Sequence, residues 1–291
     1  MEREQIRISV RNLVEFILRS GDIDNRRASL DTMEAMQAGS RLHRKIQKKM
    51  GSTYHAEVPL NIIIEEENYE LGIWGRADGI IIEETVTIDE IKGVYLSLDL
   101  LEEPVKVHLA QAKCYAYIYG IQNDLQKINV QMTYGNLDTG DLKYFSYEYS
   151  MQQLQEWFSD LILKYKKWAD FQYEWRKKRQ ASIKELAFPF PYREGQKELA
   201  AGVYRTIARK KNLFIQAPTG VGKTISTLYP AIKAVGEGLG DKIFYLTAKT
   251  VTANVAKETI GILCEKGYRA KSVQITAKEK LCACEEGTVI P

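Results

Sequence analysis

The stretch IDEIKG, Ile88 to Gly93, places two acids and a lysine at the end of an apolar run. Because successive side chains of a β-strand point to opposite faces, we expect Glu90 and Lys92 on one face and Asp89 on the other. The stretch belongs to the last of three runs rich in Ile and Val, at residues 56–66, 69–84 and 85–94. Since only short breaks separate these runs, they predict an antiparallel meander.

Helical and strand periodicity alternate around the meander. Apolar residues at helical spacing predict helices over residues 6–20, from Asp31 as N-cap to Gly51, over 105–119, and from 151 to about 179. Two further strands are predicted at residues 127–135 and 142–149, on either side of the turn residues NLDTGD. We therefore predict an α/β domain with a mixed sheet flanked by helices over residues 1–180.

A third acid, Asp78, lies in the neighbouring strand within IWGRADGII. Strand pairing can bring Asp78 beside Glu90, and two clustered carboxylates repel each other unless a divalent cation neutralises them. We therefore predict that Asp78 and Glu90 bind Mg²⁺ or Mn²⁺, which would polarise a phosphodiester and activate a water molecule. Lys92 can position that water and offset the negative charge of the transition state.

A helical pair follows the acidic strands. Gln111 and Tyr115 are four residues apart, so one helix face can direct both toward the metal site. Four signals thus occur in order: Gly39-x-x-x-His43, Asp78 in GRADG, Glu90-x-Lys92-Gly93, and Gln111-x-x-x-Tyr115.

This order resembles the RecB-like branch of the PD-(D/E)XK nucleases. The resemblance implies a restriction-endonuclease-like fold and a metal-dependent DNA nuclease, in which Asp78, Glu90, Lys92, Gln111 and Tyr115 are catalytic. It also implies two more metal ligands, His43 and the backbone carbonyl of Ile91. Ala77 stands where the motif has its proline.

Each of these signals has a structural alternative. A single Glu-x-Lys pair is most often a solvated strand face, and a lone histidine such as His43 is rarely a ligand. His55 and His108 lack a partner motif, and Cys114 lies in an apolar helix stretch typical of core packing. The alternative for the whole domain is a non-catalytic module that binds DNA ends and loads a helicase. Aromatic residues such as Trp74, Tyr95 and Tyr115 could contact DNA in either case.

The second segment begins after a break at FPFPYREGQ, where two prolines mark a boundary near residues 188–191. Helices and short apolar strands then alternate, which predicts a parallel, doubly wound sheet over residues 181–291. The predicted helices are 194–210, 223–235 and 251–266, and the predicted strands are 212–216, 242–246 and 272–275.

The glycine-rich stretch APTGVGKT, Ala217 to Thr224, lies between a predicted strand and a predicted helix. This context is typical of a phosphate-binding loop, in which backbone N–H groups surround the phosphates of ATP. The loop residues Thr219, Gly220 and Gly222 would bind the phosphates, Lys223 would add positive charge, and Thr224 would join the Mg²⁺ shell.

Three stretches together, YREGQKELAAGVYRTI, APTGVGKT and YLTAKTVTANVAKETI, resemble the first motifs of superfamily 2 DNA helicases of the XPD/DinG group. The resemblance implies a RecA-like P-loop domain, with Arg193 and Gln196 contacting adenine. Thr247, Lys249 and Thr250 would contact the nucleic-acid backbone. Cys282 would be the first ligand of a 4Fe-4S iron-sulfur cluster that forms only in a longer parent protein, because four thiolates are needed.

Charge and composition are consistent with a cytoplasmic chain that binds a polyanion. Residues 1–180 hold 24 Lys and Arg against 28 Asp and Glu, whereas residues 181–291 hold 17 against 10. Four cysteines are too few for a disulfide scaffold, and no apolar stretch predicts a membrane helix. We expect a fragment of an ATP-dependent DNA helicase with an N-terminal nuclease domain, acting in DNA repair or replication, whose partners are DNA and ATP.

Overall fold

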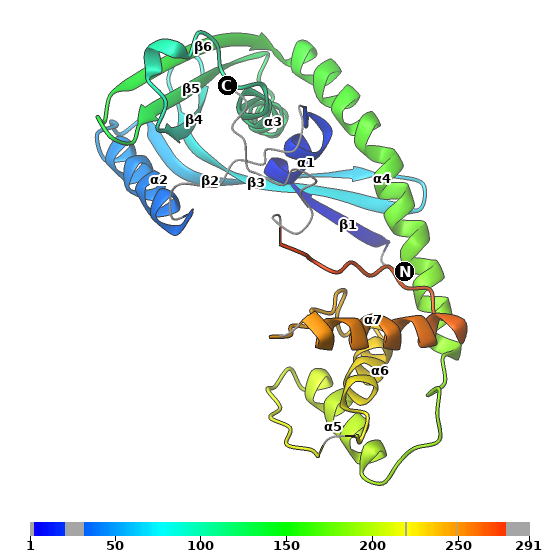
Figure 1. Ribbon diagram of the computed structural model, residues 1–291. Helices are drawn as coiled ribbons and strands as arrows, with labels where there is room; N and C mark the ends of the chain where they lie inside the picture. The colour runs from blue at the N-terminus through cyan, green and yellow to red at the C-terminus, as the bar shows by residue number, and fades with distance from the viewer. Residues whose placement is uncertain (1–2, 21–31, 219, 249, 278–291) are drawn as a thin grey trace. The chain divides into compact units, whose positions relative to one another are not determined.

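The computed structural model describes residues 3–20, 32–218, 220–248 and 250–277 (Figure 1). The chain divides into two compact units between Asp170 and Phe171. This division lies inside the long helix α4 (Met151–Glu185). The sequence-based boundary at residue 180 lies within the same helix.

A six-stranded mixed sheet forms the centre of the first unit. Its order is β1-β3-β4-β5-β6, with β2 also paired to β3. The β1–β3 and β4–β5 pairs are parallel, and the other pairs are antiparallel. The strands are β1 (Glu4–Ser9), β2 (Tyr54–Glu65), β3 (Tyr69–Ile81), β4 (Thr87–Val94), β5 (Lys127–Asn136) and β6 (Leu142–Ser150). The predicted meander and mixed sheet are confirmed.

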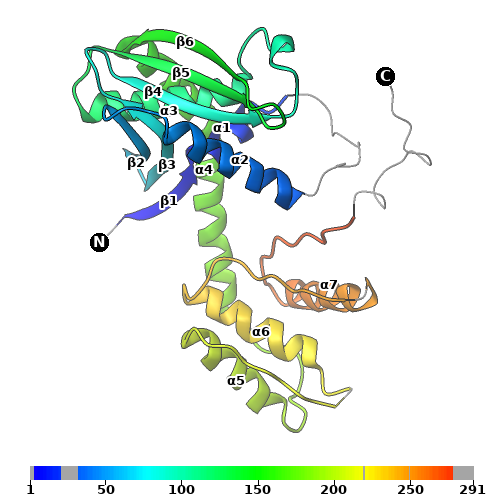
Figure 2. The ribbon, with the colours of Figure 1, turned by 90° about the vertical axis from the view of Figure 1, so that its left-hand side faces the viewer.

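Three helices cover parts of this sheet: α1 (Val10–Ile17), α2 (Thr32–Gln47) and α3 (Lys106–Gln122). A single 3-10 turn, η1 (Leu98–Leu100), precedes α3. Helices α1 and α3 pack together, and α3 also packs on β4 and β5 (Figure 1). Helix α2 contacts β4 from the other face, where Leu42 and Ile46 pack on Ile91 (Figure 2). The sheet therefore presents the end of β4 to both α2 and α3.

The opening of the chain differs from the prediction. Residues 6–9, predicted as the start of a helix, belong to β1, and the helix begins only at Val10. The Ser9 hydroxyl caps that helix by accepting the N–H of Asn12 at 3.2 Å. Pairing of β1 with β3 decided this, because Ile6 becomes buried opposite Leu71. The predicted cap Asp31 lies outside the described residues, and α2 ends at Gln47, before Gly51.

The second unit contains the end of α4 and three more helices: α5 (Gln196–Ala208), α6 (Lys223–Gly236) and α7 (Thr250–Glu265). The helix predictions for this segment are confirmed. Its core forms where the end of α4 meets α6 and α7, with Ile183, Ile232 and Leu263 almost fully buried.

The predicted parallel sheet of the second unit is wrong for the described residues. Residues 212–216, 242–246 and 272–275 form no strand there, and their apolar side chains face solvent. Phe214 is 96% exposed, Leu246 88% and Ile275 87%. An apolar run becomes a strand only when a neighbour satisfies its backbone N–H and C=O groups, and these three runs do not pair with one another.

Candidate functional site

Strand β3 changes partners part-way along one edge. Residues 69–74 pair with β1 and residues 79–81 pair with β4, which leaves residues 75–78 between the two partners. We call residues 75–78 the fork. Side chains take the place of a neighbouring strand here, because the Tyr115 side chain packs against Gly75. Oδ2 of Asp78 accepts the N–H of Ile91 at 2.8 Å.

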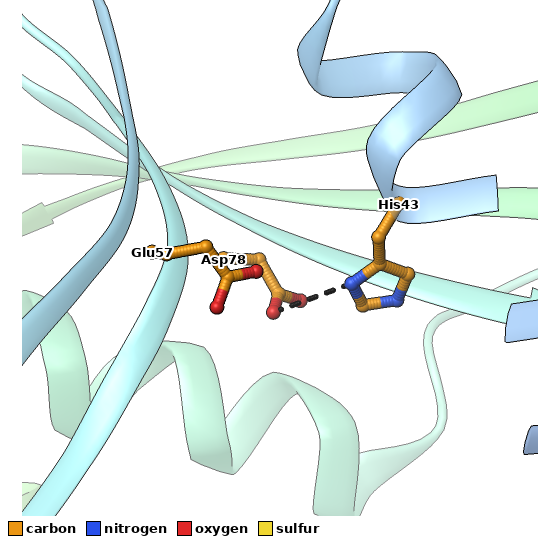
Figure 3. Close-up of side chains that lie close together, drawn as sticks. All are labelled: His43, Glu57 and Asp78. Atoms are coloured by element: carbon orange, nitrogen blue, oxygen red, sulfur yellow. Dashed lines mark ion pairs between the residues drawn. The ribbon is translucent and has the colours of Figure 1, made fainter. Parts of the chain in front are cut away.

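Three side chains that can bind a metal meet at the fork (Figure 3). His43 from α2, Glu57 from β2 and Asp78 from β3 each offer one ligand atom, and these atoms lie within 4.8 Å of one another. Nδ1 of His43 lies 3.5 Å from Oδ1 of Asp78. The structure thus brings the predicted ligands His43 and Asp78 together, although they are far apart in the sequence.

Glu57 is the member that the sequence analysis missed. Its φ of 57° lies in the left-handed region, which is costly for a residue with a side chain. The ladder between β2 and β3 skips Glu57 and Asp78, although the pairs on both sides are regular. Only this local backbone conformation marks Glu57, so no sequence motif could have found it.

The Glu57 carboxylate already has two other partners. Oε2 of Glu57 lies 2.7 Å from Nε of Arg76. Oε1 accepts the Gln47 side-chain amide at 3.2 Å, and the same amide also donates to the backbone carbonyl of Asp78 at 3.0 Å. Gln47 therefore links the two acids of the cluster from α2.

Glu90 lies on β4 and is fully buried. Burial, together with the charge of nearby Asp78, raises the pKa of Glu90 to about 8, although Lys92 lowers it. Nζ of Lys92 donates to Oε1 of Glu90 at 2.7 Å, so the predicted same-face pair is formed. Among the described residues, Oε2 of Glu90 has no hydrogen-bond partner. A buried carboxylate oxygen without a partner is rare, and it is free to accept a bond from a water molecule or to bind a cation.

Helix α3 continues the polar chain from Lys92. Nζ of Lys92 donates to the Gln111 side-chain oxygen at 3.3 Å, and the Gln111 amide lies 3.5 Å from the Tyr115 hydroxyl. Gly75 makes room for this tyrosine, because a Cβ at Gly75 would lie 2.6 Å from the Tyr115 oxygen. The predicted residues Glu90, Lys92, Gln111 and Tyr115 therefore form one connected network.

Asp89 has a separate environment, as its position in the alternating strand predicted. It is fully buried and accepts hydrogen bonds from Tyr54, Gln131 and Thr133 at 3.1, 3.2 and 2.5 Å. Burial raises the pKa of Asp89, and these three donors oppose that rise. With its oxygens occupied by protein donors, Asp89 stabilises β4 and does not face a ligand.

The donor set at the fork suits a hard divalent cation. Carboxylates with one imidazole fit Mg²⁺ or Mn²⁺ better than a thiophilic metal, and Cys114, the cysteine on α3, is buried away in the core. The unpartnered oxygen of Glu90 supports the same fit. The Ile91 backbone, which donates its N–H to Asp78, belongs to the same part of β4; its carbonyl stays a predicted ligand.

The predicted phosphate loop lies at the N-terminus of α6 in the second unit. Gly220 and Gly222 have φ values of 87° and 76°, which only glycine adopts without strain. Nζ of Lys223 donates to the carbonyls of Ala217 and Pro218 at 2.9 and 2.8 Å. The Tyr245 hydroxyl donates to Oγ1 of Thr224 at 3.4 Å. The Lys223 side chain therefore folds back onto the predicted phosphate loop.

Arg193 and Gln196 both contact this loop. Nη1 of Arg193 donates to the carbonyl of Gly220, and the Gln196 amide donates to the carbonyl of Val221 at 3.1 Å. The Gln196 side-chain oxygen accepts the N–H of Arg193 at 3.0 Å. The two residues expected to contact adenine therefore hold the phosphate loop against α5. Thr219, Lys249 and Cys282 lie outside the described residues.

Comparison with known proteins gives one local match. No protein-family model matches the chain. A probable ATP-dependent helicase of Methanocaldococcus jannaschii is 51% identical over 51 residues, which are 17% of this chain and 8% of that helicase. This match indicates a relation to helicases, over a small part of the relative's length.

The solved structure of SSO0001 is similar over 56% of this chain and 78% of its own, with 19% identity and a TM-score of 0.35. At that score the likeness supports no argument. Separately, none of the described helices is long and apolar enough to span a membrane.

Proposed function

We propose that the first unit is a metal-dependent DNA nuclease and that the second unit binds ATP as part of a DNA helicase. The observation that supports the nuclease is the meeting of two clusters at the fork. His43, Glu57 and Asp78 offer ligand atoms, and Asp78 contacts β4 at the Ile91 N–H, between the buried Glu90 and Lys92 that form an ion pair. The buried Glu90 oxygen without a partner among the described residues is consistent with a ligand-binding acid.

Each residue has a defined part in this proposal. His43, Glu57, Asp78 and Glu90 would bind Mg²⁺ or Mn²⁺, which supplies Lewis-acid activation of a phosphodiester and of water. Lys92 holds a positive charge beside Glu90 and can position the attacking water. Gln111 orients the Lys92 ammonium, and Tyr115 lies next to Gln111.

The helicase part rests on the local match and on the phosphate loop. ATP with Mg²⁺ would bind to Lys223, Thr224 and the glycines of the phosphate loop. The helicase would use ATP to move along a DNA strand. In a longer parent protein, with an iron-sulfur cluster that includes Cys282, translocation would deliver a strand to the nuclease. We place this activity in DNA repair or replication.

The decisive experiment is cleavage of linear duplex and single-stranded DNA by the full chain with Mn²⁺. Wild type should cleave, whereas Asp78→Ala and Lys92→Ala should each lose about 100-fold or more of the rate, because both remove an essential charge. Glu57→Gln should weaken Mn²⁺ binding, measured by calorimetry.

Glu148→Ala is the matched control, because Glu148 is an exposed acid of β6 paired only with Lys127. It should cleave like wild type. Equal cleavage by all variants would show a contaminating nuclease. DNA binding without Mn²⁺ uptake or cleavage would favour the non-catalytic loading module.

A further inference from the structure

An exposed tryptophan lies on the sheet directly before the fork. Trp74 of β3 is 54% exposed, whereas Ile73 beside it is fully buried. The other face of β3 is filled at this level, because Tyr115 of α3 packs against Gly75. Side chains alternate along a strand, so Trp74 projects from the face that α3 does not cover.

The strand register identifies what surrounds Trp74. Ser9 of β1 and Asn61 of β2 flank it, and two residues earlier Arg7 and Ile63 flank Gly72. Arg7, Asn61 and Ile63 are exposed. Gly72 has no side chain, and the side chains of Gln5 and Arg7 lie over it. We call Arg7, Ile63, Gly72, Trp74 and Arg76 the Trp74 platform.

Charged residues lie on both sides of Trp74 along β3. Arg7 lies opposite Gly72 in the register and its Nε donates to Gln5, whereas Arg76 follows Trp74 by two residues and pairs with Glu57. Farther from the fork, Glu65 pairs with Arg3 at 3.5 Å and Glu70 accepts from Gln5 at 3.5 Å. An arginine therefore lies on each side of the indole in the register, and a guanidinium group can contact a polyanion.

Arg76 connects the platform to the metal cluster. Its side chain is 67% exposed, and its Nε lies 2.7 Å from Oε2 of Glu57. Asp78 follows Arg76 by two residues, so Trp74 and Asp78 are about 13 Å apart along an extended strand. A strand lying along the platform would reach the fork without leaving β3.

We propose that the Trp74 platform binds single-stranded nucleic acid by stacking a base on the Trp74 indole. An exposed aromatic ring between basic groups is the arrangement that binds single strands with little sequence preference. Duplex bases have their faces covered by their neighbours, so the platform selects an unpaired strand. The inference deepens the proposed nuclease, because it states which substrate form enters the fork and from which side.

The test is a titration of the full chain with a thymidine oligonucleotide in EDTA, which prevents cleavage. Trp74→Ala should raise the Kd about 10-fold, and Trp74→Phe should restore most of the affinity because it keeps an aromatic face. Arg76→Ala should weaken binding and lower its dependence on salt.

Tryptophan fluorescence gives a second readout. Oligonucleotide should quench the wild-type signal, and Trp74→Phe should abolish the quenching. Trp168→Phe is the control, since Trp168 is a 44% exposed tryptophan of α4 that packs on Phe16. This variant should keep both the quenching and the Kd.

The outcomes separate the two proposals. An unchanged Kd for Trp74→Ala, or an equal Trp74-dependent affinity for duplex, would overturn the platform and leave the nuclease intact if wild type still cleaves with Mn²⁺. Trp74-dependent binding together with no cleavage by wild type would support the platform and overturn the nuclease. Asp78→Asn should bind the oligonucleotide like wild type and fail to cut it.

Discussion

Single residues at the fork show how position changes the chemistry of one side-chain type. Glu57 is half-buried, held by Arg76 and Gln47. Glu90 is fully buried, with one oxygen on Lys92 and the other unpartnered. Asp89, one residue away from Glu90, accepts hydrogen bonds from Tyr54, Gln131 and Thr133. Of these three carboxylates, Glu90 is therefore the one with an oxygen that no described residue contacts by a hydrogen bond.

His108 is a partly buried base with a hydrogen-bond partner that no sequence motif indicated. The Tyr134 hydroxyl accepts the N–H of Val105 at 3.0 Å and lies 3.0 Å from Nδ1 of His108. We assign the hydroxyl as donor to a neutral imidazole. Burial lowers the pKa of His108 to about 4, and the charges of Lys92 and Arg11 add to this.

A pH dependence of stability follows. An unfolded histidine titrates near 6.5, so between pH 6.5 and 4 the unfolded chain binds a proton that folded His108 does not. The contribution of His108 to the free energy of unfolding should be fully present above pH 6.5. It should decrease by roughly 2 kcal/mol as the pH falls toward 4, after allowance for solvent screening.

Urea unfolding at several pH values, compared between wild type and His108→Gln, measures this contribution. The glutamine variant should lack this part of the decrease. Parallel pH profiles for the two proteins would show that His108 protonates without cost.

At the scale of elements, pairing distinguishes the strands that form from the apolar runs that do not. Strand β3 has neighbours on both edges, and its length allows β1 and β4 to share one edge and leave the fork between them. Residues 212–216, 242–246 and 272–275 are also apolar, but they form no ladder in the described part of the second unit. Strand β3 and the three runs are all apolar in sequence. They differ in whether neighbouring strands pair with them.

Hydrogen exchange should report this difference. Amides in β3, β4 and β5 are held in ladders and should exchange slowly, whereas those in residues 212–216, 242–246 and 272–275 should exchange at the earliest time points. Mass spectrometry of peptides after deuterium labelling measures both sets in one sample. Peptides of α6, whose Ile232 is fully buried, are the internal control for the second unit. Slow exchange in the three runs would show that a sheet forms there.

At the scale of the whole molecule, two units with different candidate sites share one long helix. The group of His43, Glu57 and Asp78 lies in the unit that ends at Asp170, and the predicted phosphate loop lies in the unit that begins at Phe171. Ligands that bind only the folded state stabilise the unit that holds them. Metal and nucleotide should therefore act on different unfolding transitions.

Differential scanning calorimetry with Mn²⁺ tests this division. At about 100 times its Kd, Mn²⁺ should stabilise the first unit by about 2.7 kcal/mol and raise its Tm by roughly 5 to 10 °C. Asp78→Ala should lose this shift, and Lys223→Ala should retain it because Lys223 belongs to the other unit. An equal shift in wild type and Asp78→Ala would place the bound ion elsewhere.

The sequence by itself determined the elements of the first unit other than β1, the face shared by Glu90 and Lys92, and the glycine-rich loop, because periodicity and spacing are local properties. It also indicated that His43, Asp78 and Gln111 belong together. Only the tertiary structure decided that Glu57 joins His43 and Asp78, since its left-handed backbone arises where β2 passes the fork. Pairing likewise decided that Ile6 lies in a strand, because a strand exists only with a partner.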